Sequence, residues 1–268
     1  VSFEFFPPKT DEGRSQLRRC VDELSAADPT FVSVTYGAGG TTRGDTHDIV
    51  VEIDSSQPYP AMPHLTCIGH SRAELAAQLA GYEAAGIQNV LALAGDPPAD
   101  GAPAVGDFAY ASQLVEMARE NGNFSIGVAA FPEGHPRASS LEADRRHLAD
   151  KLALADFGIT QFFFDSGSYF RLRDDLERLG CSTPLLPGIM PLLNPTVIRR
   201  FAAMNGASFP EDLAQRVDEA PAGDAAAIAT EAATTLCDEL LAGGVPGLHI
   251  YCLNRSSVAL GILKGLGV

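Results

Sequence analysis

The chain has 268 residues and a formal net charge of −15. Such an acidic protein is poorly suited to nucleic acid or to anionic membrane surfaces, because both require basic patches. A chain of this length can bury a full hydrophobic core in one large domain without disulfides.

The five cysteines are odd in number, widely spaced and free of CxxC pairs, so we expect reduced thiols in a cytoplasmic protein. No apolar run reaches the ~18 residues of a membrane-spanning helix, and no signal peptide is recognisable. The sequence begins at Val1 inside a strand-like segment, so we expect native residues to precede it.

Strand-like and helix-like segments alternate along the whole chain. Apolar or β-branched runs predict strands at 1–7, 31–36, 61–68, 89–94, 124–131, 159–165, 184–190 and 247–253. Three- and four-residue periodicity predicts helices at 10–26, from 45, from 71, and at 108–121, 140–155, 167–179, 195–204, 210–218, 224–243 and 255–266. Ser71 and Glu74 form a capping-box pattern at the third helix.

Eight strand–helix units predict the fold class α/β, with a parallel sheet closed into a (β/α)8 TIM barrel. We expect one catalytic barrel over residues 1–268, without a regulatory domain. An open doubly wound sheet is the alternative, but no dinucleotide-binding glycine fingerprint follows the first strand.

The first strand carries a single charge, Glu4, among small and aromatic residues. Strand alternation places Ser2, Glu4 and Phe6 on one face. A buried carboxylate is costly unless it is paired or neutralised, and a desolvated carboxyl has a raised pKa and can donate a proton. The alternative is an edge strand with Glu4 in water.

Polar residues that are unusual in strands gather at the carboxyl ends of the predicted strands, where barrel enzymes place their chemistry. They are Glu4, Thr35, His64, Asp96, Glu133, His135, Gln161 and the segment Tyr251 to Arg255. Each alone has a structural explanation, such as a core histidine or a turn-forming aspartate. Together they favour an acid–base site built on Glu4 and Asp96.

Other catalytic signatures are missing from the sequence. The histidines lack the spacing of a metal site, and there is no nucleophile elbow or phosphate-binding glycine–lysine loop. No lysine ends a strand, because Lys151 falls in a helix, which disfavours a Schiff-base aldolase.

At these positions the sequence resembles the methylenetetrahydrofolate reductase family, in the short bacterial form. The resemblance covers nearly the whole chain and rests on several motifs in order: Ser2 to Pro8, Phe31 to Gly37, Pro63 to Cys67, Gly95-Asp96, Ala130 to Pro136, Ile159 to Asp165, Pro187 to Pro191 and Tyr251 to Arg255. The family is a (β/α)8 barrel, which agrees with the strand count.

The resemblance implies hydride reduction of 5,10-methylenetetrahydrofolate to 5-methyltetrahydrofolate. Glu4 matches the general acid that protonates N10, and Asp96 matches a carboxylate beside the flavin and pterin rings. The residues that match substrate-binding positions are Gln161, Phe201, Tyr251 and Arg255.

The resemblance also implies FAD, reduced by NADH or NADPH. The residues matching its cofactor-binding positions are Thr35, His64, Gly95, Tyr110, Ala111, Phe131, Glu133, His135, Asp144, His147 and Lys151. Ala94, Phe131 and His147 depart from the family's arginine, tyrosine and asparagine. The missing arginine leaves two alternatives. Either Arg145, Arg146 or Lys151 supplies the cation for FAD, or the nicotinamide reduces the folate directly without flavin.

The sequence leaves two other functions open beside the reductase. One is a TIM-barrel lyase or isomerase that uses Glu4 and Asp96 on another substrate. The other is a folate- or nucleotide-binding barrel without catalysis, which the joint presence of Glu4, Asp96 and Gln161 disfavours. The expected partners are a tetrahydrofolate derivative and a nicotinamide dinucleotide, with no nucleic acid or membrane. The acidic composition favours NADH over NADPH. The sequence does not decide whether the protein is a homo-oligomer.

Overall fold

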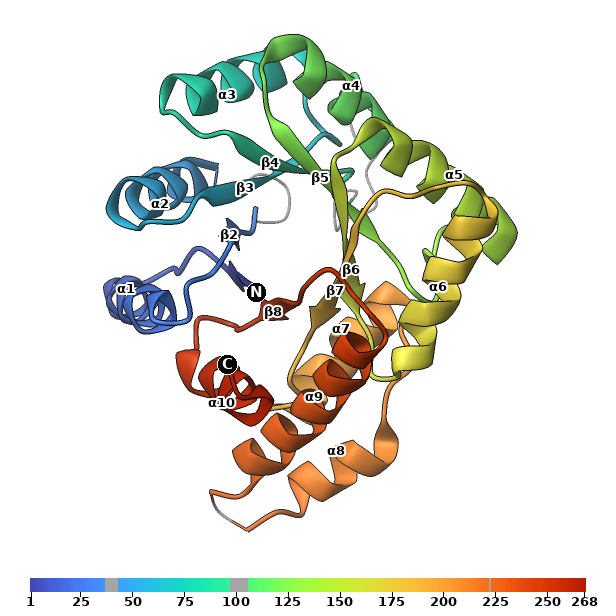
Figure 1. Ribbon diagram of the computed structural model, residues 1–268. Helices are drawn as coiled ribbons and strands as arrows, with labels where there is room; N and C mark the ends of the chain where they lie inside the picture. The colour runs from blue at the N-terminus through green and yellow to red at the C-terminus, as the bar shows by residue number, and fades with distance from the viewer. Residues whose placement is uncertain (37–42, 97–105, 222) are drawn as a thin grey trace.

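Eight parallel strands close into a barrel in chain order, and the last strand pairs with the first (Figure 1). The computed structural model describes residues 1–36, 43–96, 106–221 and 223–268. The strands are β1 (Ser2–Phe5), β2 (Phe31–Val34), β3 (Ala61–Thr66), β4 (Asn89–Leu93), β5 (Ser125–Ala130), β6 (Phe157–Phe162), β7 (Leu185–Ile189) and β8 (His249–Tyr251).

The helices lie outside the barrel, and the first six follow the strands one by one. In the described ranges they are α1 (Asp11–Ser25), α2 (Arg43–Ser56), α3 (Arg72–Ala84), α4 (Ala111–Asn121), α5 (Leu141–Leu154), α6 (Ser166–Arg178), α7 (Pro195–Asn205), α8 (Glu211–Asp218), α9 (Ala225–Ala242) and α10 (Ser256–Leu266). Three helices, α7 to α9, separate β7 from β8.

The closed ladder confirms the (β/α)8 fold and excludes the open doubly wound sheet. Predicted and observed elements agree in order, and most boundaries differ by one to three residues. The capping box is confirmed, because the Ser71 side chain accepts from the Glu74 amide and Glu74 accepts from the Ser71 amide. Gly37, the last residue of the motif Phe31 to Gly37, lies outside the described residues.

The first strand is a central strand, so the edge-strand alternative is wrong. It pairs with β2 on one side and with β8 on the other. Phe3 and Phe5 are fully buried against the surrounding helices, and Glu4 points to the barrel interior between them. Phe6 lies beyond the end of the strand and is 40% exposed, so burial does not extend to the third phenylalanine.

The buried apolar residues form a large cluster between strands and helices and two smaller ones. Met62, Leu91 and Ile159 fill part of the barrel interior. The third cluster, which includes Phe162 and Ile198, lies beneath α7 and α8. This packing fixes α7 next to the carboxyl end of β6.

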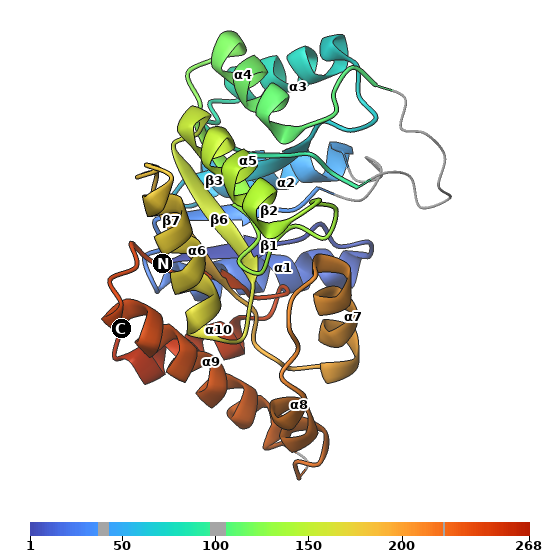
Figure 2. The same cartoon turned by 90° about the vertical axis from the view of Figure 1, so that its right-hand side faces the viewer.

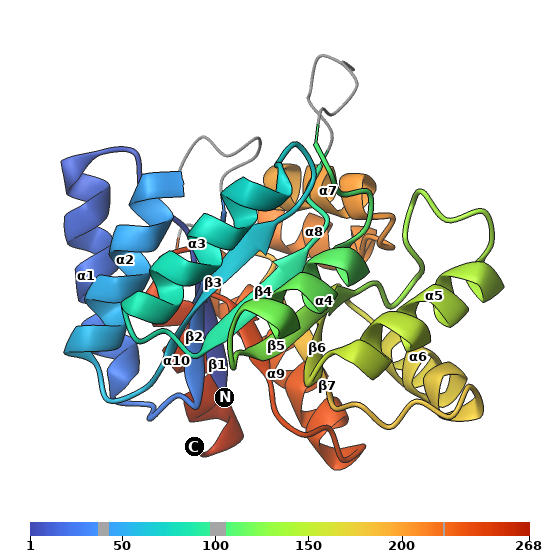
Figure 3. The same ribbon diagram turned by 90° about the horizontal axis from the view of Figure 1, so that it is seen from above.

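The two chain ends lie near each other at the end of the barrel where the strands begin (Figures 2 and 3). Helix α7 lies towards the opposite end, where the strands finish (Figure 2). All five cysteines are free. In the described part of the chain, no helix has both the length and the apolar character to cross a membrane.

Candidate active site

The carboxylate of Glu4 lies between two histidines inside the barrel. His64 Nε2 of β3 is 3.4 Å from Glu4 Oε2, and His249 Nε2 of β8 is 3.6 Å from the same oxygen. The Glu4 side chain is 18% exposed, so it is largely desolvated but still open to a small molecule. A carboxyl group in this position can exchange a proton with a bound substrate.

Burial lowers the pKa of His64, and the nearby His249 lowers it further, while Glu4 acts in the opposite direction. His64 Nε2 also lies 3.3 Å from Ser33 Oγ, the neighbour of Glu4 in the β1–β2 ladder. His64 is therefore held as a neutral hydrogen-bonding group beside the acid.

Tyr251 crosses the barrel from β8 to β6. Its hydroxyl donates to the Thr160 carbonyl over 2.7 Å, and burial, followed by the charge of Glu4, raises its pKa well above the usual value. The β6–β7 ladder shifts register here, and the Gly188 amide donates to the Thr160 hydroxyl over 2.8 Å. A Cβ at Gly188 would overlap the Thr160 carbonyl and the Tyr251 ring.

This register shift occurs at the strand segment that carries Gln161. Bulges of this kind re-aim side chains next to active sites. The partly buried Gln161 accepts a hydrogen bond of 3.3 Å from Asn205 Nδ2 at the end of α7. Phe201 lies one turn earlier on α7 and is 36% exposed.

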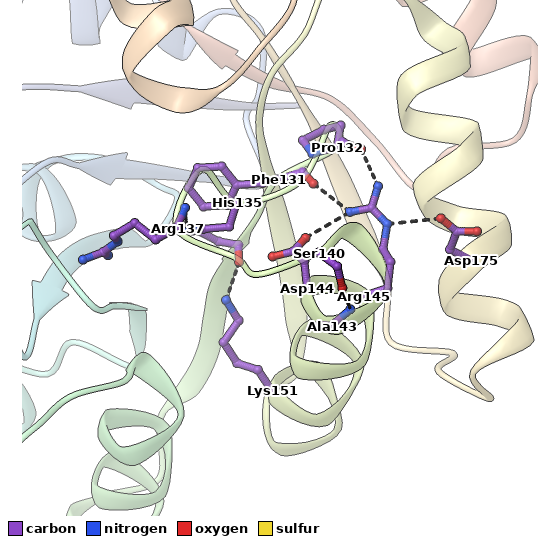
Figure 4. A network of polar contacts seen from close by, with 11 residues as sticks. Phe131, Pro132, His135, Arg137, Ser140, Ala143, Asp144, Arg145, Lys151 and Asp175 are labelled. Carbon is purple, nitrogen blue, oxygen red and sulfur yellow. Dashed lines mark hydrogen bonds and ion pairs between the residues drawn. The ribbon is translucent and has the colours of Figure 1, made fainter.

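The loop after β5 is tied to α5 by a buried cation. Arg145 is 5% exposed, and its guanidinium donates to the carbonyls of Phe131 (3.0 Å) and Pro132 (2.6 Å). It also pairs with Asp144 and Asp175, each at 3.2 Å (Figure 4). Four of its five N–H donors are therefore used within the chain.

The loop after β5 carries two aromatic rings that pack against each other. The rings of Phe131 and His135 meet edge to face at 4.5 Å. Burial lowers the pKa of His135, Arg137 lowers it further, and Asp144 and Asp96 oppose the shift. Glu133 is held by Ser208, whose amide and hydroxyl both donate to its carboxylate.

Lys151 lies partly buried on α5, and its ammonium donates to the Ala129 carbonyl over 2.7 Å (Figure 4). Desolvation lowers its pKa to about 8, although Asp144 acts in the opposite direction. Lys151 lies on a helix and does not end a strand, as expected. Its ammonium nevertheless reaches the carboxyl half of β5.

The remaining predicted residues lie at the ends of β2 and β4 and at the start of α4. Thr35 is half-buried, and its carbonyl accepts from Thr46 Oγ1 over 3.1 Å. Gly95 has φ +84°, with Thr66 3.0 Å from where a Cβ would stand. Tyr110 is 70% exposed, whereas the following Ala111 is buried.

The expected acid–base pair is not a contact pair. Asp96 is exposed, and within the described ranges no hydrogen bond joins it to Glu4. The side chains of Tyr110, His147, Phe201 and Arg255 are also exposed, and no described hydrogen bond, ion pair or ring contact links them to Glu4. The structure thus brings Glu4 together with His64 and Tyr251, and holds Gln161 at the neighbouring strand.

A model of the methylenetetrahydrofolate reductase family matches residues 1–267. The chain belongs to this family. The 5,10-methylenetetrahydrofolate reductase of Escherichia coli (strain K12) is 40% identical over 272 residues, which cover 100% of this chain and 90% of the relative. Methylenetetrahydrofolate reductase (NADH) 1 of Arabidopsis thaliana is 36% identical over 284 residues, covering 100% of this chain and 48% of the relative.

Two solved structures share the barrel. An uncharacterised protein from Clostridium thermocellum that binds two copies of 5-methyl-5,6,7,8-tetrahydrofolic acid matches with a TM-score of 0.68 at 14% identity, covering 100% of this chain and 95% of that chain. A 2,3-dimethylmalate lyase matches with a TM-score of 0.51 at 13% identity, covering 98% and 79%. At such low identity these matches concern the fold alone. Membership of the reductase family does not favour the lyase or isomerase alternative.

The side chains of this family member do not fit a flavin pyrophosphate well. Ala94 offers no cation, and the three expected replacements are engaged elsewhere. Arg145 is enclosed by carbonyls and carboxylates, and Arg146 pairs with Glu142 on the surface at 2.5 Å. Lys151 is bound to a backbone carbonyl. The Asp144 carboxylate, at a flavin-contacting position of the family, is paired with Arg145.

Sequence analysis missed His249, which is completely buried beside Glu4. The signal was present, because His249 and Tyr251 alternate on the last strand as Ser2 and Glu4 do on the first. Among the described residues, no three histidine, cysteine or acidic side chains are grouped as metal ligands.

Proposed function

We propose that this chain reduces 5,10-methylenetetrahydrofolate to 5-methyltetrahydrofolate, with a nicotinamide dinucleotide as the source of hydride. The observation that carries the proposal is the desolvated Glu4 carboxyl at the carboxyl end of β1, in a chain that matches the reductase family over its full length. Family members with NADH in their names and the acidic composition favour NADH over NADPH.

In this reaction Glu4 is the general acid. Its proton goes to N10 of the folate, the bond from N10 to the bridging methylene breaks, and that carbon becomes an iminium with N5. Hydride adds to the same carbon and leaves a methyl group on N5. The neutral His64 and the Tyr251 phenol border the acid and shield part of it from solvent.

Gln161 is the proposed hydrogen-bonding partner of the folate ring. Its carbonyl oxygen is occupied by Asn205, so its amide N–H groups are left for the ligand. The register shift between β6 and β7 lies at the strand segment that carries Gln161. Phe201 is exposed on the same helix as Asn205, which supports a role in covering a bound ring.

We further propose that hydride passes from the nicotinamide directly to the folate. Arg145, Arg146 and Lys151 are committed to partners within the chain, and Ala94 supplies no charge. Charge-assisted hydrogen bonds are worth about 1.5–3 kcal/mol each, so their loss weakens a pyrophosphate-bearing cofactor by roughly ten- to a hundredfold per contact.

The test combines a visible spectrum with turnover. We expect purified protein without the flavin absorption bands that still oxidises NADH when methylenetetrahydrofolate is supplied. Bands that persist through purification would refute direct transfer, while absence of folate-dependent NADH oxidation would refute the reductase function.

The acid role is tested by Glu4→Gln. General acid catalysis contributes about 10²- to 10⁴-fold, so we expect a loss of that order in turnover, with NADH binding retained. Glu12→Gln, an exposed carboxylate on α1, is the matched control and should turn over normally. Normal turnover in Glu4→Gln would remove Glu4 from the mechanism.

A further inference from the structure

His249 has a buried nitrogen that no hydrogen bond satisfies. The side chain is 0% exposed, and Nε2 has no hydrogen-bond partner in the described part of the chain. A buried polar atom without a partner costs about 1–3 kcal/mol. The polar atom that faces it is Glu4 Oε2, at 3.6 Å. At this separation the two atoms lie slightly beyond hydrogen-bonding distance, so a small movement of either side chain would bring them into contact.

The other nitrogen of the ring is fixed by Ser2. Ser2 Oγ lies 2.8 Å from His249 Nδ1 and donates to the Leu248 carbonyl over 3.3 Å. A serine hydroxyl has one proton to donate. When that proton goes to the carbonyl, the oxygen must accept from Nδ1, so Nδ1 carries a hydrogen.

With Nδ1 protonated, a neutral His249 turns a bare lone pair towards Glu4 Oε2. A bare nitrogen facing a carboxylate oxygen is repulsive, since both are acceptors. One proton between them removes the repulsion, either on the carboxyl oxygen or on Nε2. Both arrangements contain the same number of protons, and both give the orphaned nitrogen its hydrogen bond.

We propose that Glu4 and His249 share one proton, and that His249, oriented by Ser2, is the positioning residue that keeps this proton on the acid. The inference rests on the proposed acid role of Glu4. In the transfer step the Glu4 O–H bond breaks and an N–H bond forms on the folate nitrogen. The pair is left as a carboxylate and a neutral imidazole, and it regains its proton from water.

The other groups that face Glu4 and His249 are less suited to share the proton with the carboxylate. His64 Nε2 already has Ser33 Oγ at 3.3 Å, and burial lowers the pKa of that imidazole. The Tyr251 ring packs edge-on against His249, and burial keeps its phenol protonated. Phe31 stacks on the His249 ring at 5.9 Å and carries no charge.

The first test reads protons directly by NMR of protein labelled with ¹⁵N-histidine. His249→Gln identifies the His249 signals. We expect Nδ1 to be protonated near neutral pH, and the titration of His249 to move by about one pH unit or more in Glu4→Gln. An unprotonated Nδ1, or a titration that is the same in Glu4→Gln, would overturn the shared proton. This measurement needs no turnover, so it decides the inference even if the reductase function fails.

The second test is the pH profile of turnover in His249→Gln. Without the imidazole, Glu4 alone must hold the proton, so we expect the alkaline limb to move to lower pH by about one unit. Turnover near neutral pH should then fall by about tenfold and recover in acid. Ser2→Ala should shift the limb in the same direction by less.

A loss in His249→Gln that is equal at every pH would mean a structural role and contradict the inference. If the alkaline limb of the pH profile moved in His64→Gln but not in His249→Gln, the shared proton would belong to His64. This result would also overturn the inference.

Discussion

The hydrogen bond from the Tyr251 hydroxyl to the Thr160 carbonyl can be tested by mutation, because a second buried tyrosine, Tyr169, serves as a matched control. In Tyr251→Phe the Thr160 carbonyl loses a donor at 2.7 Å at the point where the β6–β7 ladder is already interrupted. Tyr169 makes the same kind of buried bond, from its hydroxyl to the Leu185 carbonyl at 2.7 Å. Tyr169 lies on α6, where it packs against Phe163 outside the barrel interior.

A buried carbonyl left without its donor costs about 1–3 kcal/mol, so both phenylalanine variants should lose stability by that amount. Urea unfolding measures the loss as a shift in midpoint at unchanged slope. The two variants should differ in function. Only Tyr251→Phe loosens the segment before Gln161, and we expect its KM for the folate to rise by about tenfold, which corresponds to 1.4 kcal/mol.

Two results would refute this reasoning. Wild-type stability in Tyr251→Phe would mean that the phenol does not support the register shift. An equal rise in KM in Tyr169→Phe would mean that the effect comes from general loosening of the barrel rather than from the position of Gln161.

Two predictions concern α5 and its buried cations. Arg145→Met leaves the Asp144 carboxylate and two carbonyls without the guanidinium, while Asp175 keeps its second partner Arg178, and we expect a loss of about 3–5 kcal/mol in urea unfolding. Arg171→Met, which breaks an exposed pair, should cost under about 1 kcal/mol, and equal losses would contradict the burial argument. The pKa of Lys151 is lowered to about 8, so above that pH the unfolded chain binds more protons than the folded protein does. Relative to Lys151→Met, the stability of the wild type should therefore rise by about 2 kcal/mol between about pH 8 and about pH 9.5; a constant difference would mean that the ammonium is not desolvated.

The sequence carried enough information for the barrel and for the direction of the Glu4 side chain. The order of strands and helices follows from local apolar patterns, and the Ser71 cap follows from side-chain chemistry three residues apart. Glu4 could be singled out because one charge stands in an aromatic strand, and the alternation of Phe3 and Phe5 gave its direction correctly.

The partners of these residues could not be predicted, because they come from distant strands. The pairing of Ser2 with His249 joins residues 247 positions apart and depends on the register of barrel closure. Arg145 looks like a surface residue in the sequence of α5. Its burial arises because the loop after β5 turns its carbonyls towards the helix, which periodicity does not reveal.

The closure of β8 onto β1 has a consequence for synthesis of the protein. The ribosome makes the strand with Glu4 first and the strand with His249 and Tyr251 last. Until the last strand emerges, β1 keeps one open edge, and Glu4 lacks its neighbours His249 and Tyr251. A nascent or truncated chain therefore lacks part of the polar surroundings of Glu4, which form only when the ring of strands is complete.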